Sequence, residues 1–177
     1  FMVVINKILT LREGFFYEPM LNPPSIQTTS DPFLNKDVSY TNKNCSGGVC
    51  SQFKIIGGDE SYLYVGYRGD DWLFIEQIHM KIKETDTQIK LSGSFDREVM
   101  SGGTVEELLS VRIDKSIYEF IKSSLGKTVI VRMNGKQYYK DFEFDVSDDP
   151  KKGQWSLFIQ NFKPKFDEEI TPNSTST

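Results

Sequence analysis

DDWLFIEQIHMKI, residues 70–82, is the stretch of sequence that decides the fold. From Trp72 onward its even-numbered positions are apolar, with the single exception of Glu76, whereas its odd-numbered positions become polar toward the end. Successive side chains of a strand point to opposite faces, so this alternation is typical of a strand with one face on the core. The pattern predicts a long central strand over residues 72–82, with Trp72 and Phe74 on the inward-facing side.

Glu76 lies within the apolar register of this strand. A carboxylate buried there without a partner would be costly. An ion pair with an arginine would avoid that cost, and so would a β-bulge that turns the side chain outward. We take the ion pair as the first expectation, with the bulge and a functional acid as alternatives. The candidate arginines are Arg97, Arg112 and Arg132.

The composition favours a folded, β-rich domain and argues against several classes of partner. The 177 residues suffice for one well-buried domain, and an aromatic content of 13% is typical of packed sheet surfaces. A formal net charge of -4 disfavours general binding to nucleic acid or to an anionic membrane surface, because both require a basic field. No apolar run approaches the roughly 20 residues of a membrane-spanning helix.

Other strand patterns flank this central stretch. Strands are expected on both sides of a turn at Gly57–Glu60, and again over residues 88–95 and 105–113, because apolar residues alternate there with polar ones. The pair Asn134-Gly135 suits a type I′ turn, so it predicts a hairpin over residues 128–146.

Two later segments change to a helical period. Residues 114–125 carry an apolar stripe after the potential N-cap Asp114, and residues 150–162 carry a second one. Strands followed by late helices indicate an α+β domain. We therefore expect a single antiparallel β-sheet of about five to seven strands, with two C-terminal helices packed on one face.

The chain divides on this pattern into a core domain and less regular ends. Prolines, serines and threonines dominate residues 18–50, which are expected to form a docked arm or a mobile loop segment. The expected parts are an N-terminal strand or arm over 1–17, this loop segment over 18–50, the α+β core over 51–163 and a polar tail over 164–177.

Cys45 and Cys50 are the two cysteines of the chain. The glycines between them allow a small disulfide loop in an oxidising compartment, and the sequence leaves a disulfide and two free thiols equally open. Together with the single histidine, His79, they are too few ligands for a typical zinc site, so no metal or other cofactor is expected. A disulfide would favour an extracytoplasmic or secreted protein, and a chain that begins at Phe1 leaves an earlier leader open.

Gly57-Gly58-Asp59-Glu60 resembles the GGDE core of diguanylate cyclases, in which the glycines let the backbone approach a guanine nucleotide and a carboxylate holds a metal. The resemblance covers four residues. Ser61 stands where that family has an aromatic residue, and too few residues precede the motif for the first elements of the family fold. We interpret these residues as a tight turn between strands. A small carboxylate-based enzyme, centred on Glu76 or on this turn, is the alternative function.

The tyrosines are the remaining feature of the sequence that bears on function. Tyr62 and Tyr64 share one face of their strand, Tyr67 lies on the other, and Tyr139 follows directly after Tyr138. Exposed tyrosine is typical of recognition surfaces, and no nucleophile–base pair or phosphate-binding loop stands out. We therefore expect a non-catalytic binding or interaction module with an aromatic-bearing sheet surface. Its partner would be a protein or a small molecule, and self-association through an exposed sheet edge is a further expectation.

Overall fold

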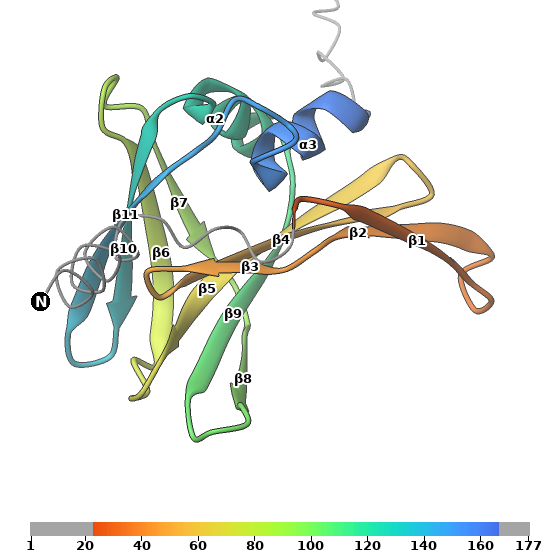
Figure 1. Cartoon of the computed structure of the whole chain (residues 1–177). Helices are drawn as coiled ribbons and strands as arrows, with labels where there is room; N and C mark the ends of the chain where they lie inside the picture. Colours follow the sequence, from red (N-terminus) through yellow and green to blue (C-terminus); the bar gives the residue numbers. More distant parts are fainter. Residues whose placement is uncertain (1–22, 167–177) are drawn as a thin grey trace, which may run out of the picture.

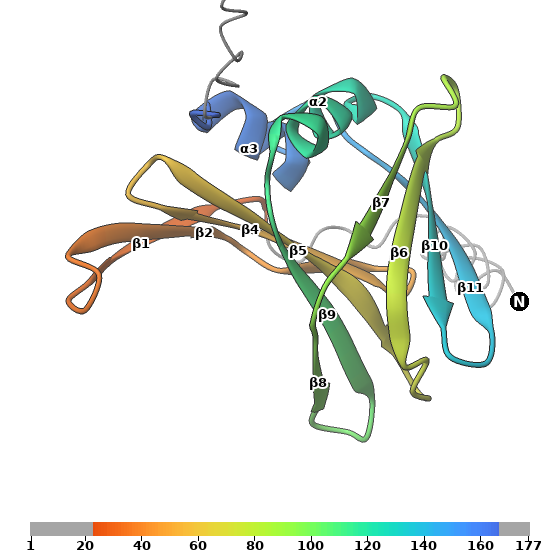
Figure 2. The ribbon, with the colours of Figure 1, turned by 180° about the vertical axis from the view of Figure 1, so that it is seen from behind.

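The computed structural model describes residues 23–166 as two antiparallel β-sheets and two helices (Figure 1). A seven-stranded sheet has the order β1-β2-β4-β5-β9-β8, with β3 paired to β4. A four-stranded sheet has the order β11-β10-β6-β7. Both helices lie at one end of the molecule, over the space between the sheets (Figures 1 and 2).

The bounds of these elements follow the chain. The strands are β1 (Ile26–Asp31), β2 (Lys36–Thr41), β3 (Asn44–Ser46), β4 (Val49–Ile56), β5 (Glu60–Gly69), β6 (Ile75–Ile82), β7 (Gln88–Ser92), β8 (Phe95–Val99), β9 (Val105–Arg112), β10 (Thr128–Gly135) and β11 (Tyr139–Asp145), and the helices are α2 (Lys115–Ser124) and α3 (Gln154–Asn161).

One apolar core fills the space between the two sheets and beneath the helices. Phe53 and Leu63 from the seven-stranded sheet belong to the same buried cluster as Met80 and Val131 from the four-stranded sheet. Helix α3 contributes Phe158, whose ring stacks on that of Phe53 with centroids 4.3 Å apart. The apolar stripes predicted for both helices therefore face this core.

The predicted single sheet is wrong, and one of the two helices predicted at the C-terminus lies in mid-chain, whereas α3 does follow the last strand. The chain changes sheets between β5 and β6, between β7 and β8, and between β9 and β10, where α2 lies. Alternation in a sequence shows that a strand has one apolar face. It does not show whether helices or a second sheet cover that face. The mainly β-sheet, antiparallel character was predicted correctly.

The central strand is shorter than predicted and changes register near its start. β6 begins at Ile75, and Met80 and Ile82 face the core as expected. Phe74 precedes the strand with 47% of its surface exposed, so its predicted inward orientation is wrong. Asn134 of β10 pairs with Gln77 and Gly135 with Ile75, which leaves Glu76 as the extra residue of a bulge.

This bulge explains how Glu76 fits into an apolar stretch. The Glu76 side chain is exposed and forms no salt bridge within residues 23–166. The expected ion pair is therefore wrong, and the bulge alternative is confirmed. Trp72 is partly buried, and Leu73 and Ile75 occupy the core positions that the sequence pattern assigned to Trp72 and Phe74.

The N-terminal part of the described chain is more regular than expected. Residues 18–50 were expected to lack strands, but β1, β2 and β3 lie within them. Thr, Ser and Asp occupy most of β1, and both faces of this edge strand are largely exposed, so apolar alternation is absent. The strand or arm expected over 1–17, most of the tail over 164–177 and the start of the loop segment lie outside the described residues.

Glu107 of β9 connects the two sheets. Its side chain is fully buried and accepts hydrogen bonds from the backbone N–H groups of Leu73, Phe74 and Ile75, at 2.6, 2.9 and 2.8 Å. Arg97 of β8 donates to the same carboxylate at 3.0 Å and to the carbonyl of Ile75 at 3.0 Å. A side chain of the seven-stranded sheet thus fixes the start of the central strand of the other sheet.

Replacement of Glu107 by alanine should destabilise the protein strongly. It would leave three backbone N–H groups without their acceptor and the Arg97 guanidinium without its carboxylate partner, so we expect a loss of about 3–5 kcal/mol in the free energy of unfolding. Urea denaturation would measure it. Glu98→Ala is the matched control, because Glu98 is an exposed carboxylate on the adjacent strand β8 and should change stability by less than about 0.5 kcal/mol. Similar effects of the two substitutions would contradict the role of Glu107.

Candidate functional site

The connection between β5 and β6 presents Phe74 to solvent in an unusual backbone conformation. Its φ is +52°, a left-handed value that a bulky residue rarely adopts. Such a conformation persists only where its surroundings hold it in place, and it is common at binding sites. Here the Glu107 carboxylate accepts the N–H of Phe74 and those of both neighbours. The exposed ring is therefore held on a fixed backbone.

Two side chains flank the Phe74 ring, and a third contacts the neighbouring backbone. The Trp72 ring stacks beside it with centroids 6.1 Å apart, and the Arg97 guanidinium lies 5.8 Å from its centroid. The Tyr138 hydroxyl donates to the Trp72 carbonyl at 3.4 Å. We call Trp72, Phe74, Arg97 and Tyr138 the aromatic loop surface. The β5–β6 connection and the β10–β11 turn lie at the end of the molecule opposite the helices (Figures 1 and 2).

Gly135 allows the β10–β11 hairpin to approach this loop. A Cβ atom at Gly135 would lie 2.1 Å from the carbonyl oxygen of Leu73, so no larger residue fits without movement. The hairpin itself was predicted correctly, but its turn was not. Asn134 and Gly135 belong to β10, and the Gly135 N–H donates to the Tyr138 carbonyl at 3.0 Å. The glycine serves close packing rather than the expected type I′ turn.

The tyrosines predicted to bind a partner lie in three different environments. Tyr62 and Tyr64 are half-buried on the face of β5 that points away from the core. Tyr67 is buried, and its hydroxyl accepts a hydrogen bond from Lys140 at 3.0 Å. Tyr139 is 57% exposed on β11, with the Arg132 guanidinium 4.3 Å from its ring centroid. The structure does not bring these four residues into one site.

The sequence pattern missed Phe74 as a surface residue. It assigned Phe74 to the core, together with Trp72, because both continue the even-numbered apolar positions. Phe74 is exposed, whereas Trp72 is partly buried and packs against the core. A signal was nevertheless present. Leu73 and Ile75 offer an apolar pair in the opposite register, and Glu76 marks the position where the two registers meet.

The carboxylates of the alternative enzyme do not converge. Asp59, Asp70 and Glu76 are exposed, and none of them lines the cleft of about 80 Å³ that lies between the β3–β4 hairpin, the end of β11 and the start of α3. Gly57 and Gly58 have φ values of +59° and +78° in the turn between β4 and β5. The interpretation of these residues as a turn is confirmed.

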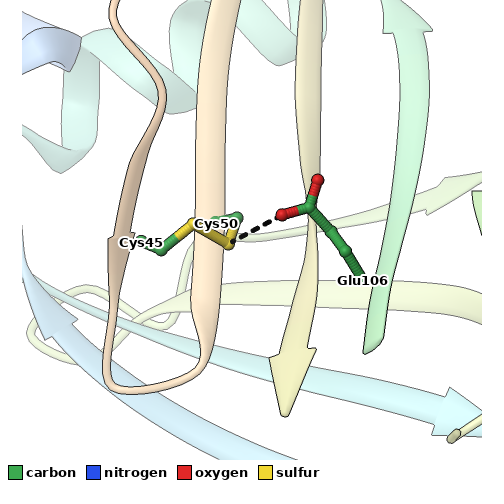
Figure 3. Close-up of side chains that lie close together, drawn as sticks. All are labelled: Cys45, Cys50 and Glu106. Atoms are coloured by element: carbon green, nitrogen blue, oxygen red, sulfur yellow. Dashed lines mark hydrogen bonds between the residues drawn. A yellow bond between two sulfur atoms is a disulfide. The ribbon is translucent and has the colours of Figure 1, made fainter. Parts of the chain in front are cut away.

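A second polar cluster surrounds the disulfide between Cys45 and Cys50 (Figure 3). Glu106 is 3% exposed, and its carboxylate accepts hydrogen bonds from Lys43 and Arg68 at 2.5 Å each. One of its oxygens lies 3.9 Å from the sulfur of Cys50. Glu106 and Glu107 point to opposite faces of β9, as expected for neighbours in a strand.

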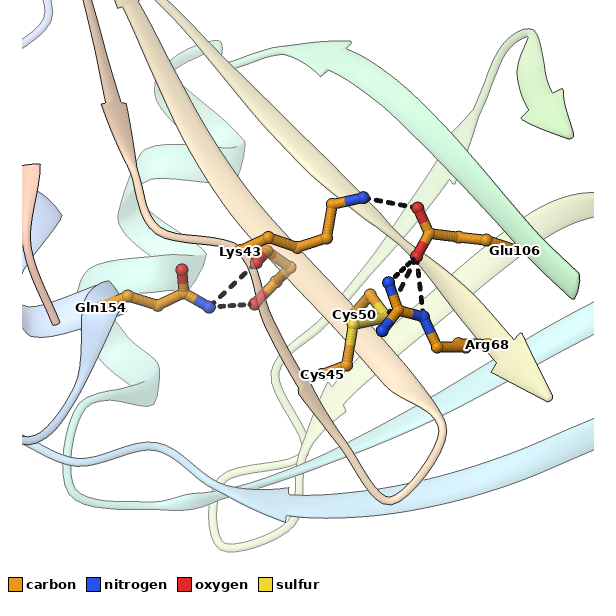
Figure 4. Close-up of a disulfide and its surroundings, with 7 residues drawn as sticks. Lys43, Cys45, Cys50, Arg68, Glu106 and Gln154 are labelled. Carbon is orange, nitrogen blue, oxygen red and sulfur yellow. Dashed lines mark hydrogen bonds and ion pairs between the residues drawn. A yellow bond between two sulfur atoms is a disulfide. The ribbon is translucent and has the colours of Figure 1, made fainter. Parts of the chain in front are cut away.

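This cluster is not arranged as a metal site. The two sulfur atoms and the Glu106 carboxylate lie within 4.8 Å of one another, a spacing that suits a metal ion. Both sulfurs, however, are joined in the disulfide and offer no thiolate ligand. The carboxylate is neutralised by Lys43 and Arg68 instead (Figure 4).

The comparisons with known proteins identify no relative. No protein family matches the chain, and no curated protein and no solved structure matches it at a significant level. Within residues 23–166, no helix has the length and apolar character needed to cross a membrane.

An alanine variant is usually more stable to unfolding than a glycine variant at the same position. At Phe74 this order of stability should be reversed. Glycine adopts positive φ without strain, so Phe74→Gly should be about 1 kcal/mol more stable to unfolding than Phe74→Ala. Ser110 is the control, because it is exposed in the middle of β9 without a positive φ, and Ser110→Gly should be less stable than Ser110→Ala. Chemical denaturation of the four variants measures both differences. The same order at both positions would contradict the backbone conformation of Phe74.

The Glu106 cluster should make stability depend on acidic pH. Burial raises the pKa of the Glu106 carboxyl, but hydrogen bonds and charges from Lys43 and Arg68 outweigh that effect and lower its pKa below the ordinary value of 4.5. A carboxyl with a lowered folded-state pKa stabilises the protein above the unfolded-state pKa, and this contribution is lost as pH falls through the folded-state pKa. The stability difference between the wild type and Glu106→Gln should therefore be constant near neutral pH and shrink below about pH 4.3. A difference that grows on acidification would contradict this assignment.

Proposed function

We propose that the protein is a non-catalytic binding module that holds a protein partner through the aromatic loop surface. The observation that carries this proposal is the exposed Phe74 ring on a backbone of positive φ, fixed by the buried Glu107. Because the Phe74 ring is exposed, packing of the core does not account for its strained backbone conformation. It is consistent with a contact residue that is ordered before its partner arrives.

The chemistry of the surface supports a protein as partner. Trp, Tyr and Arg are the residues most enriched at the energetic centres of protein interfaces, and Trp72, Tyr138 and Arg97 accompany Phe74 here. Asp70 and Asp71 are exposed beside this group and form no salt bridge within the described part of the chain. The expected partner therefore offers an apolar side chain flanked by Lys or Arg, which complements both the rings and the two carboxylates.

Location and self-association remain parts of this proposal. The disulfide is compatible with an oxidising, extracytoplasmic environment, in which such a bond persists. β1 is an edge strand of the seven-stranded sheet and carries no lysine or proline that would discourage pairing with another chain. Association of two copies through β1 is thus compatible with the fold and independent of the aromatic loop surface.

Selection of random peptides displayed on phage would test the proposed partner chemistry. Peptides recovered on the full chain should combine an apolar side chain with a neighbouring Lys or Arg. Their affinity should fall about 30-fold in Phe74→Ala, the effect of losing an interface residue worth about 2 kcal/mol. Asp71→Asn should weaken binding mainly at low salt.

Tyr62→Ala is the control that separates this surface from the tyrosines of β5. It should leave the affinity of the selected peptides unchanged, because Tyr62 lies on the outer face of the seven-stranded sheet. Peptides that are insensitive to Phe74→Ala but lost in Tyr62→Ala would overturn the aromatic loop surface as the binding site. Failure to select any peptide would also count against the proposal.

A further inference from the structure

We propose that the disulfide between Cys45 and Cys50 is a thiol–disulfide exchange site, at which an external thiolate attacks the Cys45 sulfur and Cys50 leaves. The site is separate from the aromatic loop surface and does not depend on the proposed function. It involves the three-residue strand β3, the start of β4 and the Glu106 cluster on the adjacent strands (Figure 4).

The two cysteines differ in their exposure to solvent. Cys50 lies within β4 and is 0% exposed, whereas Cys45 lies on β3 and is only partly buried. Among the strands of residues 23–166, β3 pairs with β4 alone, so within this part of the chain Cys45 sits on an edge strand. Exchange requires an attacking thiolate to approach one sulfur directly. Cys45 is therefore the sulfur that can be attacked.

The surroundings of Cys50 suit a departing thiolate. Lys43 and Arg68 both bind the carboxylate of Glu106, and this cluster of three side chains carries a net charge of +1, since two cations face one anion. The carboxylate oxygen that accepts from Arg68 lies 3.9 Å from the Cys50 sulfur, and a carboxylate alone would oppose a thiolate there. Lys43 and Arg68 neutralise this carboxylate, so the cluster as a whole does not repel the atom that would become negative. Nearby Lys and Arg stabilise a thiolate, and a more stable thiolate leaves faster.

The exchange balances with a thiol as the co-reactant. A thiolate of a low-molecular-weight thiol forms a bond to the Cys45 sulfur while the bond between Cys45 and Cys50 breaks, and the electron pair of that bond remains on Cys50. A second thiolate then attacks the mixed disulfide at the external sulfur and releases Cys45 as a thiolate. The protein disulfide is reduced by two electrons, and two molecules of the thiol are oxidised to their disulfide.

Exchange would have a structural consequence next to the disulfide. Asn44 and Ser46 flank Cys45 on β3 and line the cleft beside α3, together with Ser51 and Gln154. Gln154 donates to the hydroxyl and the carbonyl of Ser51 at 2.6 and 3.1 Å, so this wall of the cleft remains attached to β4. Loss of the covalent link would leave the opposite wall held by the short β3–β4 pairing, the Lys43–Glu106 ion pair and the hydrogen bond from the Arg68 N–H to the Gly48 carbonyl.

The test is to map the mixed disulfide on the full-length wild-type chain. The protein is incubated with reduced glutathione, quenched with acid, alkylated and digested for mass spectrometry. Among the molecules that carry one glutathione, glutathione is expected mainly on Cys45 and the alkyl group on Cys50, whereas the denatured chain should show no preference. Glutathione mainly on Cys50, or divided equally between the two cysteines of the folded protein, would overturn the proposal.

Two substitutions test the role of the charged cluster. Lys43→Met removes one cation and should slow the reduction of the disulfide by glutathione about three- to tenfold. Lys54→Met is the matched control. Lys54 lies on β4, the strand that carries Cys50, but its ammonium group contacts the Tyr40 ring and does not contact Glu106. Equal rates for both variants and the wild type would overturn the part of the proposal that assigns Lys43 and Arg68 to the leaving group.

Discussion

The buried carboxylate of Glu107 is the interaction on which the two-sheet arrangement depends. A strand that crosses from one sheet to another leaves backbone N–H groups without ladder partners at the crossing point. Here three of those groups belong to Leu73, Phe74 and Ile75, and all of them donate to one side chain of β9. Arg97 balances the charge of this carboxylate and bonds to the same segment. A buried charge is stable only with such complete pairing.

Two adjacent glutamates of β9 thus have different tasks on its two faces. Glu107 lies on the face toward the core and fixes the β5–β6 connection, whereas Glu106 lies on the opposite face, where it is buried among Lys43, Arg68 and the disulfide region. The alternation of a strand separates the two carboxylates, although they are neighbours in sequence. The proposed partner surface and the proposed exchange site each depend on one of them, so the two sites are structurally independent.

Much of the secondary structure follows from the sequence, but the assembly of the strands does not. Residues such as Met80, Ile82, Phe120 and Phe158 were predicted on the apolar faces of their elements, and the core contains them. Local periodicity could not show that a second sheet covers the first. It also missed β1, because this edge strand is exposed on both faces and has no apolar pattern.

The candidate site was harder to predict than the core for a related reason. The inward assignment of Phe74 failed because Glu76 forms a bulge that shifts the register, and a bulge in one strand depends on the pairing of its neighbour β10. Gly135 was assigned to a type I′ turn, but it lies in β10, where a Cβ atom would meet the carbonyl of Leu73, a residue 62 positions away in the chain. Such tertiary causes leave no periodic signal in one sequence.

Amide hydrogen exchange at Leu73, Phe74 and Ile75 tests the central role of Glu107 most directly. Although these residues lie at a surface connection, the buried carboxylate should protect their N–H groups, and their exchange should be slowed to nearly the same degree as that of Met80 within β6. Exchange as fast as at the exposed neighbours Asp70 and Asp71 would show that Glu107 does not hold this segment.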